Sequence, residues 1–465
     1  MSQTFPRVKP RLAPPLDPAF LPAVLVNHAF QAEVAAAGGG VPLVLGLEQP
    51  NGIVSRFATR VFPAGHPLAD ANLFYTERLF KFLLWQHGGW KVYVGGPPNI
   101  GAALQTIYAP GGAREFDDHF MGEDVYDKPF TIVPCTPEDV PPARESGRPL
   151  GRHLEGYRLG FDLGASDRKV SAVVNGEAIY SEEVVWEPTV HSDPDYHYRE
   201  IMAGLRAAAV KLPRVDAIGG SAAGIYVDNQ VRVASLFRGV PRERYGEIRN
   251  LFLRIRDEMG VPLEIVNDGD VTALAGAMSL EDNGVLGIAL GSSQASGYVA
   301  PDGTITGWLN ELAFAPVDYN PDASTDEWSG DHGVGATYFS QQCVFRLAPR
   351  AGITIPEGMT PAAQLKFVQE KLEAGHPGAT QIWETMGIYM GYGIAHYADF
   401  YDLRHVLILG RCTSGKGGQI ILEGANAVLA AEFPELATRL HLQLPDEKSR
   451  RVGQSIAAAS LPALV

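Results

Sequence analysis

The stretch Tyr157-Arg158-Leu159-Gly160-Phe161-Asp162-Leu163-Gly164-Ala165-Ser166 decides how the rest of this chain is interpreted. It predicts an apolar strand that ends near Asp162, followed by a tight turn over 164–166. A second apolar strand then reaches Asn175-Gly176, the commonest pair for a two-residue type I′ hairpin turn. A third strand over 177–185 would complete an antiparallel sheet.

Two interpretations of the turn over 164–166 remain open at this point. Glycine lets the backbone bend sharply or approach a ligand closely, and Ser166 adds a hydroxyl beside the Asp162 carboxylate. Exposed amides with a hydroxyl and a carboxylate suit a phosphate and a divalent cation. The alternative is an ordinary hairpin in which Asp162 only caps a turn.

Length and composition limit the class of protein. The 465 residues suggest roughly three domains of about 150 residues each. A net charge of −15 argues against non-specific nucleic-acid binding, which needs a basic surface. Three widely spaced cysteines, Cys135, Cys343 and Cys412, predict neither a disulfide framework nor a cysteine zinc site, and favour the cytoplasm. We find no secretory signal and no run of about 18 apolar residues, so we expect no membrane association.

The order of predicted elements indicates an α/β protein. We expect an extended proline-rich arm over 1–20, an added N-terminal α/β domain over 21–150, a first lobe over 151–270 and a second lobe over 271–465. Residues 95–98 are expected to form a surface turn, residues 242–259 one long helix, and residues from 271 onward a small-residue helix. The closing helix is expected to return to the first lobe.

Asn267-Asp268 is the best catalytic candidate in the sequence. It follows a short apolar strand over 263–266, and a carboxylate there can accept a proton from an attacking hydroxyl. The alternative is that Asp268 is the N-cap of the helix that follows. Gly291-Ser292-Ser293 is a second turn of small residues between predicted strands, like the turn over 164–166. Two such turns can bind a polyphosphate through their amides and hydroxyls.

A glycine-rich loop follows the predicted strand over 405–409. Its sequence, Gly410-Arg411-Cys412-Thr413-Ser414-Gly415-Lys416-Gly417, nearly matches the P-loop pattern but lacks the final Ser or Thr that binds magnesium. We therefore expect this loop to lie against the flat face of an adenine ring. The alternative, a P-loop of a nucleotide hydrolase, is less favoured.

From Tyr157 to the end, these pieces resemble the ROK family of sugar kinases and repressors, within the actin/hexokinase superfamily. Residues 157–174 resemble the first phosphate motif, and 219–228 resemble the family's G-x-P-G-x-V-D stretch. Val266-Asn267-Asp268 resembles the N-D-A-N-A-A-A signature, whose Asp is the catalytic base. Residues 291–297 and 310–314 stand where the second phosphate motif and G-E-x-G-H belong.

The chain departs from the family pattern at several positions. Ser329 and Val334 stand at two of the zinc-cysteine positions, so we expect no structural zinc. Phe314 replaces the zinc-ligating and sugar-contacting His, and Ala336 replaces a sugar-contacting Glu. Ser293 replaces the central Gly of the second phosphate motif. The usual glucose-type pocket is therefore expected to be altered.

The resemblance implies a two-lobed actin-like (ribonuclease H-like) fold and ATP-dependent phosphoryl transfer to a sugar or polyol. Asp268 would be the base, Asp162 would hold Mg²⁺ directly or through water, and Asn267, Glu311 and Ser221 would bind substrate. The expected cofactor-binding residues are Asp162, Gly164, Ala165, Ser166, Lys169, Gly291, Ser292, Ser293, Gly410, Gly415 and Gly417. We expect a homodimer. The alternative is a catalytically inactive sugar- or nucleotide-binding protein of the same fold.

Overall fold

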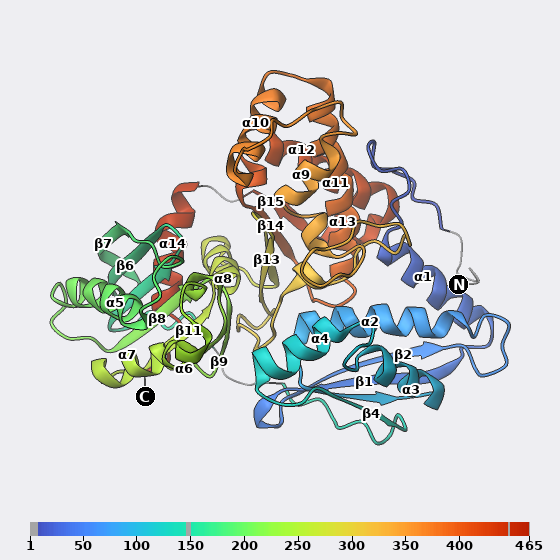
Figure 1. Ribbon diagram of the computed structural model, residues 1–465, viewed down its shortest axis with the longest axis horizontal. Helices are drawn as coiled ribbons and strands as arrows, with labels where there is room; N and C mark the ends of the chain where they lie inside the picture. Colours follow the sequence, from blue (N-terminus) through green and yellow to red (C-terminus); the bar gives the residue numbers. More distant parts are fainter. Residues whose placement is uncertain (1–7, 146–149, 445–446, 465) are drawn as a thin grey trace. The chain divides into compact units, whose positions relative to one another are not determined.

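The computed structural model describes residues 8–145, 150–444 and 447–464, which form two compact units (Figure 1). Of the described residues, the first unit comprises 8–145, 288–296 and 307–444, and the second comprises 150–287, 297–306 and 447–464. The fold is mixed α/β, as the sequence predicts. Two of the boundaries between the units fall inside strands, β12 (Val285–Leu290) and β13 (Gln294–Val299).

The second unit is built on a five-stranded sheet in the order β11-β8-β5-β6-β7. Strands β5 (Tyr157–Leu163), β6 (Asp167–Val174) and β7 (Glu177–Val185) form the predicted antiparallel meander. Asn175 and Gly176 have φ values of 49° and 86°, which confirms the expected two-residue turn. Strands β8 (Ala217–Ala222) and β11 (Leu263–Asn267) extend the sheet in parallel with β5.

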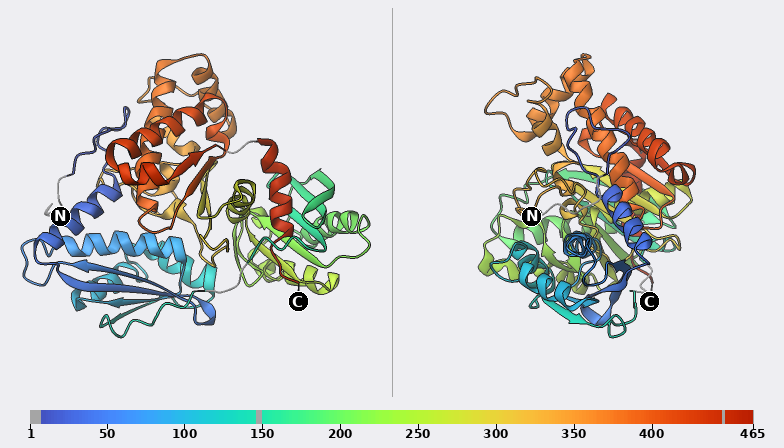
Figure 2. Two further views of the ribbon diagram at one scale, coloured as in Figure 1. Left: turned by 180° about the vertical axis from the view of Figure 1, so that it is seen from behind. Right: turned by 90° about the vertical axis from the view of Figure 1, so that its right-hand side faces the viewer.

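Helices cover this sheet. Apolar side chains of α5 (Pro194–Ala209) and α7 (Leu251–Met259) pack with those of β5 and β8 in one core. The closing helix α14 (Glu447–Ala459) packs against β5, β8 and α8 (Asp268–Leu280) (Figure 2). A Cβ at Gly219 would overlap the carbonyl of Ala458, so glycine permits this close approach.

The prediction of one long helix over 242–259 is wrong, because the helix is not continuous. The structure forms η4 (Arg242–Arg244), α6 (Tyr245–Arg249) and α7 instead, and the break falls at Asn250. Asn250 has φ −98° and ψ 11°, and its side-chain amide donates to the carbonyl of Gly246. A side chain that bonds to the local backbone competes with helix formation, which accounts for the interruption. A two-stranded sheet of β9 (Ile225–Val227) and β10 (Gln230–Val233), with η3 (Ser235–Phe237), precedes these helices.

The first unit begins with a four-stranded sheet in the order β2-β1-β3-β4. Its strands are β1 (Val41–Glu48), β2 (Val54–Val61), β3 (Lys91–Gly95) and β4 (Thr131–Cys135). Helix α2 (Ala71–His87) lies along one face of this sheet (Figures 1 and 2). The turn expected over 95–98 is confirmed at its centre, where Gly96 forms a bend, but Gly95 belongs to β3 and Pro98 is the first residue of α3 (Pro98–Ile107), where its fixed φ suits the first helical turn. The remaining elements here are α1 (Ala23–Ala36), η1 (Pro50–Gly52), α4 (Glu115–His119) and η2 (Phe120–Tyr126).

A fourth sheet has the order β13-β12-β14-β15, with β14 (His405–Leu409) and β15 (His441–Gln443) parallel. Helices α11 (Pro377–Tyr397) and α12 (Lys416–Glu432) pack against each other beside it. Short elements connect these parts: η5 (Leu312–Phe314), η6 (Gly335–Thr337), α9 (Gln341–Leu347), α10 (Pro361–Glu373), η7 (Arg411–Thr413) and α13 (Pro434–Arg439).

The proline-rich arm is anchored where it is described. The buried carboxylate of Asp17 pairs with Arg346 at 3.2 Å and Arg350 at 3.0 Å. The ring of Phe20 packs 4.7 Å from that of Tyr389 on α11. Residues 8–20 are therefore held on the C-terminal helices of the same unit, and residues 1–7 of the predicted arm lie outside the described part of the chain.

Candidate functional site

Three of the predicted site residues of the second unit meet at one edge of its sheet. Parallel pairing sets Asp162 of β5 opposite Ser221 of β8, and the same register sets Asn267 of β11 opposite Ala222. The Ser221 hydroxyl is fully buried and donates a 2.7 Å hydrogen bond to Asp162 Oδ1. The carboxyl ends of parallel strands in open α/β sheets are where ligands bind. The edge therefore presents a candidate site.

Asp268 comes directly after β11 and is the first residue of α8. Asn267, not Asp268, is the N-cap: its Oδ1 accepts from the amide of Gly269 at 2.7 Å. Its Nδ2 donates to the carbonyl of Gly224 at 2.8 Å, which fixes the side chain. The interpretation of Asp268 as a helix cap is therefore wrong, and so is the start of α8 at Val271. A capping Asn starts a helix earlier than hydrophobic periodicity suggests.

The electrostatics of this edge favour a bound cation. Burial, and second the nearby Asp162 carboxylate, raise the pKa of Asp268 to about 6. Burial also raises the pKa of Asp162, although the Ser221 hydrogen bond and Lys169 act in the opposite direction. The negative charge of Asp162 disfavours the ionised form of Asp268, and a cation or a proton held beside the two carboxylates would offset this repulsion. Mg²⁺ takes one or two protein carboxylates together with phosphates and water, and this pair fits it.

The first predicted phosphate turn is exposed, and side-chain contacts within it and just after it hold it in place. Ala165 and Ser166 are exposed. The Ser166 hydroxyl donates to Asp167 at 3.0 Å, and Lys169 forms a 3.2 Å ion pair with the same carboxylate. Sequence reasoning did not predict that Asp167 would contact both Ser166 and Lys169. It also missed the buried Trp186, whose Nε1 donates to the carbonyl of Gly164 at 2.8 Å.

In the first unit, the second phosphate turn adjoins the glycine-rich loop. The turn over 291–293 joins β12 to β13 and is closed by the Gly291 amide, which donates to the Ser293 carbonyl at 3.0 Å; Ser292 and Ser293 are exposed. Gly410 has φ 101°, and a Cβ there would lie 2.5 Å from the Leu290 carbonyl oxygen. Glycine is thus required for the loop after β14 to approach the end of β12.

The loop over 410–417 ends at the N-terminus of α12, where Gly415 is the cap. The Lys416 amide donates to the Glu373 carboxylate of α10 at 2.8 Å, and the Lys416 ammonium donates to the Glu373 carbonyl at 3.0 Å. Gly417 packs against the indole of Trp383. A P-loop lysine reaches phosphates, whereas this lysine is bonded to Glu373, a partner the sequence did not indicate.

Glu311 and Phe314 lie against α2. The amides of Asn310 and Glu311 donate to the carbonyls of Gln86 at 2.9 Å and Trp85 at 3.0 Å. The Phe314 ring lies 4.3 Å from the Trp85 ring, and the rings of Phe116 and Phe120 complete the cluster. The position where the resemblance places a polar His is thus part of an aromatic cluster.

In residues 8–145, 150–444 and 447–464, no group of three or more His, Cys, Asp or Glu side chains could hold a metal ion. Within the same residues, no helix has the length and apolar character needed to cross a membrane.

Comparison with known proteins supports a fold relationship. No protein-family model matches the sequence, and no curated protein does. Among solved structures, a ROK family transcriptional regulator, a homologue of the E. coli MLC protein, matches with a TM-score of 0.52 and 18% identity over 66% of this chain and 78% of that one. The ROK hexokinase of Thermus thermophilus matches with a TM-score of 0.50 and 16% identity over 65% and 98%. About two thirds of this chain therefore has the actin-like fold found in ROK family structures.

Proposed function

We propose that this protein transfers the terminal phosphoryl group of ATP to a hydroxyl of a sugar or sugar-like substrate. The observation that carries the proposal is the pair of carboxylates Asp162 and Asp268 at the carboxyl ends of β5 and β11, with the pKa of Asp268 raised to about 6. A base with a pKa near the working pH accepts a proton efficiently. Phosphoryl transfer needs little more from the protein than positioning and charge compensation.

Asp268 accepts the proton of the attacking hydroxyl in this proposal. Asn267 holds the start of α8 in place through its bonds to Gly269 and Gly224, and so orients Asp268. Ser221 acts through Asp162, because its buried hydroxyl is bonded to that carboxylate. Glu311 binds a substrate hydroxyl. The amides and hydroxyls of the turns over 164–166 and 291–293 bind phosphate oxygens, Lys169 lies beside the first turn, and the loop with Gly410, Gly415 and Gly417 receives the adenosine.

Mg²⁺ belongs to this proposal because the nucleotide would carry it. Asp162 would hold the ion, directly or through water, with its second oxygen free of the Ser221 bond. When bound, the ion neutralises charge that develops on the phosphate oxygens. Its charge would also lower the pKa of Asp268, which keeps the base ionised.

A catalytically inactive sugar- or nucleotide-binding protein is the second candidate. The observation in its favour is Phe314, packed among Trp85, Phe116 and Phe120, which leaves no imidazole at that position for a substrate. The same fold also occurs in a ROK family transcriptional regulator, so the fold does not decide between the two functions.

A single screen separates the candidates. The full-length protein is incubated with Mg·ATP and a panel of hexoses, pentoses, amino sugars and polyols, and phosphorylated product is detected by mass spectrometry. Thermal shift is recorded on the same panel, because a ligand of the native state raises the apparent stability. Phosphorylated product supports the kinase; a sugar that shifts the melting temperature without product supports the binding protein.

A further inference from the structure

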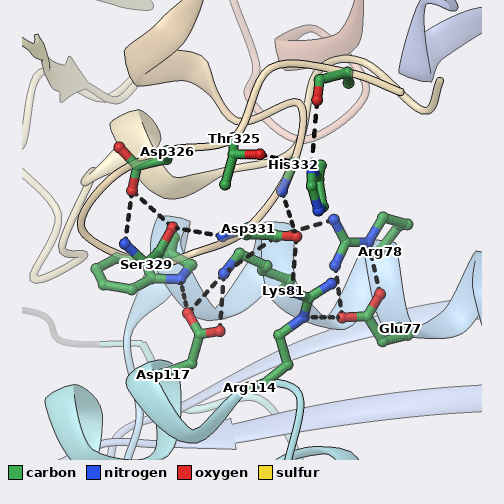
Figure 3. A network of polar contacts seen from close by, with 12 residues as sticks. Glu77, Arg78, Lys81, Arg114, Asp117, Thr325, Asp326, Ser329, Asp331 and His332 are labelled. Carbon is green, nitrogen blue, oxygen red and sulfur yellow. Dashed lines mark hydrogen bonds and ion pairs between the residues drawn. The ribbon is translucent and has the colours of Figure 1, made fainter. Parts of the chain in front are cut away.

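Six charged side chains, five of them buried, form a cluster in the first unit (Figure 3). The cations are Arg78, Lys81 and Arg114, and the anions are Glu77, Asp117 and Asp331. Lys81 pairs with Asp117 at 2.8 Å and with Asp331 at 3.4 Å. Arg78 and Arg114 each contact both Glu77 and Asp331, at 2.6 to 3.0 Å.

Three positive and three negative charges make the cluster neutral as a whole. Burial by itself would raise the pKa of Asp331, but Lys81, Arg78 and Arg114 together lower that pKa well below its usual range. The Trp85 indole adds a 2.5 Å hydrogen bond to Asp117. Buried charges are tolerated only when they are paired in this way, and removal of one partner leaves the others uncompensated. Loss of one member should therefore destabilise the packing of the segments that the cluster joins.

The cluster joins α2 and the start of α4 to a single turn far along the chain. That turn, residues 325–332, is closed internally: the Asp326 carboxylate accepts from the amide and hydroxyl of Ser329, and the Asp326 amide donates to the Asp331 carbonyl. The Asp331 carboxylate also accepts from the His332 amide at 2.8 Å. Asp331 is thus the point at which the turn is fixed to α2.

The same helix holds the segment that contains Glu311. One turn after Lys81, the carbonyls of Trp85 and Gln86 accept from the amides of Glu311 and Asn310. The ring of Phe314 packs against that of Trp85 at an interplanar angle of 34°. Helix α2 therefore contacts the chain at 310–314 and again at 331, so both ends of this stretch depend on one rigid element.

We propose that α2 is the positioning element of the substrate-binding segment, and that Asp331, Lys81 and Arg78 are positioning residues that act on Glu311 through α2 and the backbone of 310–333. This assigns a role to the N-terminal region, because its helix α2 holds the segment that carries Glu311, the residue that binds the substrate. The proposal rests on the proposed function only in naming Glu311 as that residue.

Hydrogen–deuterium exchange on the full-length protein tests the mechanical link without any substrate. Asp331→Asn keeps the shape but leaves two guanidinium groups and one ammonium group with two carboxylates. We expect exchange of the amides in both 325–333 and 310–314 to become faster, on the order of a hundredfold. Glu327→Gln, at the exposed tip of the same turn, is the matched control and should leave both segments unchanged.

Three results decide the proposal. Faster exchange in both segments supports it, while faster exchange in 325–333 alone, or in neither segment, overturns it. If Asp331→Asn does not fold, Arg114→Gln decides by the same measurement, because the Arg114 side chain lies at the edge of the cluster and is 15% exposed.

Kinetics then separate this proposal from the proposed function. Once a substrate is known, Asp331→Asn should raise KM for the sugar about tenfold and leave KM for ATP unchanged, which a general loss of stability would not do. Absence of any phosphorylated sugar would remove the proposed function but leave the exchange result standing.

Discussion

The Ser221 hydroxyl donates a 2.7 Å hydrogen bond to Asp162, although the two residues are 59 positions apart in the chain. Parallel pairing of β5 and β8 sets them side by side, so the bond follows from sheet register. The bond is made to Oδ1 of Asp162, and the charge of the same carboxylate raises the pKa of Asp268, the residue that follows β11.

Asp268→Asn should lower turnover by about 10²–10⁴-fold on an identified substrate, because the amide cannot accept the proton. Asn267 remains as the cap of α8, so the fold and substrate affinity should survive. Steady-state kinetics and circular dichroism check both statements. Asp257→Asn, on the exposed surface of α7, is the control and should leave turnover unchanged. Near-normal turnover in the Asp268 variant would remove it as the base.

The pKa of Asp268 should lie near 6 in the free protein, because burial and the charge of Asp162 both disfavour its ionised form. The folded pKa lies above the unfolded value, so the stability that this group contributes is present below pH about 4 and is lost as the pH rises through 6. NMR titration of ¹³C-labelled aspartate measures the midpoint. Asp162→Asn should lower this midpoint. An unchanged midpoint would mean that the charge of Asp162 does not affect the pKa of Asp268.

Asp162→Asn should weaken Mg-dependent nucleotide binding, because the cation loses its protein carboxylate. Isothermal titration calorimetry with Mg·ADP and with ADP in EDTA gives the comparison. We expect the advantage of Mg·ADP over free ADP, seen with the unaltered protein, to disappear in the variant. Equal Mg dependence in the two proteins would contradict the metal assignment.

Gly410→Ala should destabilise the first unit by about 2 kcal/mol or more and weaken nucleotide binding. The left-handed φ of 101° costs an alanine about 1–2 kcal/mol, and its Cβ would also press on the Leu290 backbone. Gly358→Ala is the matched control, since φ is 78° there but no atom lies within 4 Å. Urea unfolding of both variants should show the larger loss at Gly410; equal losses would mean that the close approach to Leu290 is relaxed without cost.

The first unit should lose stability in acid through His396. This side chain is buried beside Phe82 and Phe400, and burial lowers its pKa to about 4 despite the attraction of Asp399. The unfolded chain takes up the proton near pH 6.5, so the stability is lost between pH 6.5 and about 4. His396→Gln should flatten this part of the stability profile. His28, whose pKa is raised by its hydrogen bond to Asp399, changes stability in the opposite sense, because its contribution is lost as the pH rises.

The sequence by itself determined the elements whose signals are local. Asn175-Gly176 specified the hairpin between β6 and β7, because its two residues adopt positive φ values that few other pairs tolerate. The apolar run of β11 followed by Asn267-Asp268 placed a carboxylate at a strand end. Strand β14 has the predicted bounds, His405–Leu409.

Only the tertiary structure decided which side chains meet. Asp331 lies 253 positions from Arg78, and Lys416 lies 43 positions from Glu373. No local pattern marks such partners, because a buried charge finds its counter-ion only when distant segments pack together and water is excluded. From the sequence, Phe314 is only a replacement of the sugar-contacting His. In the structure, its ring packs against Trp85 of α2. Local backbone preference therefore determined the elements, and long-range packing determined the chemistry of the surfaces that they form.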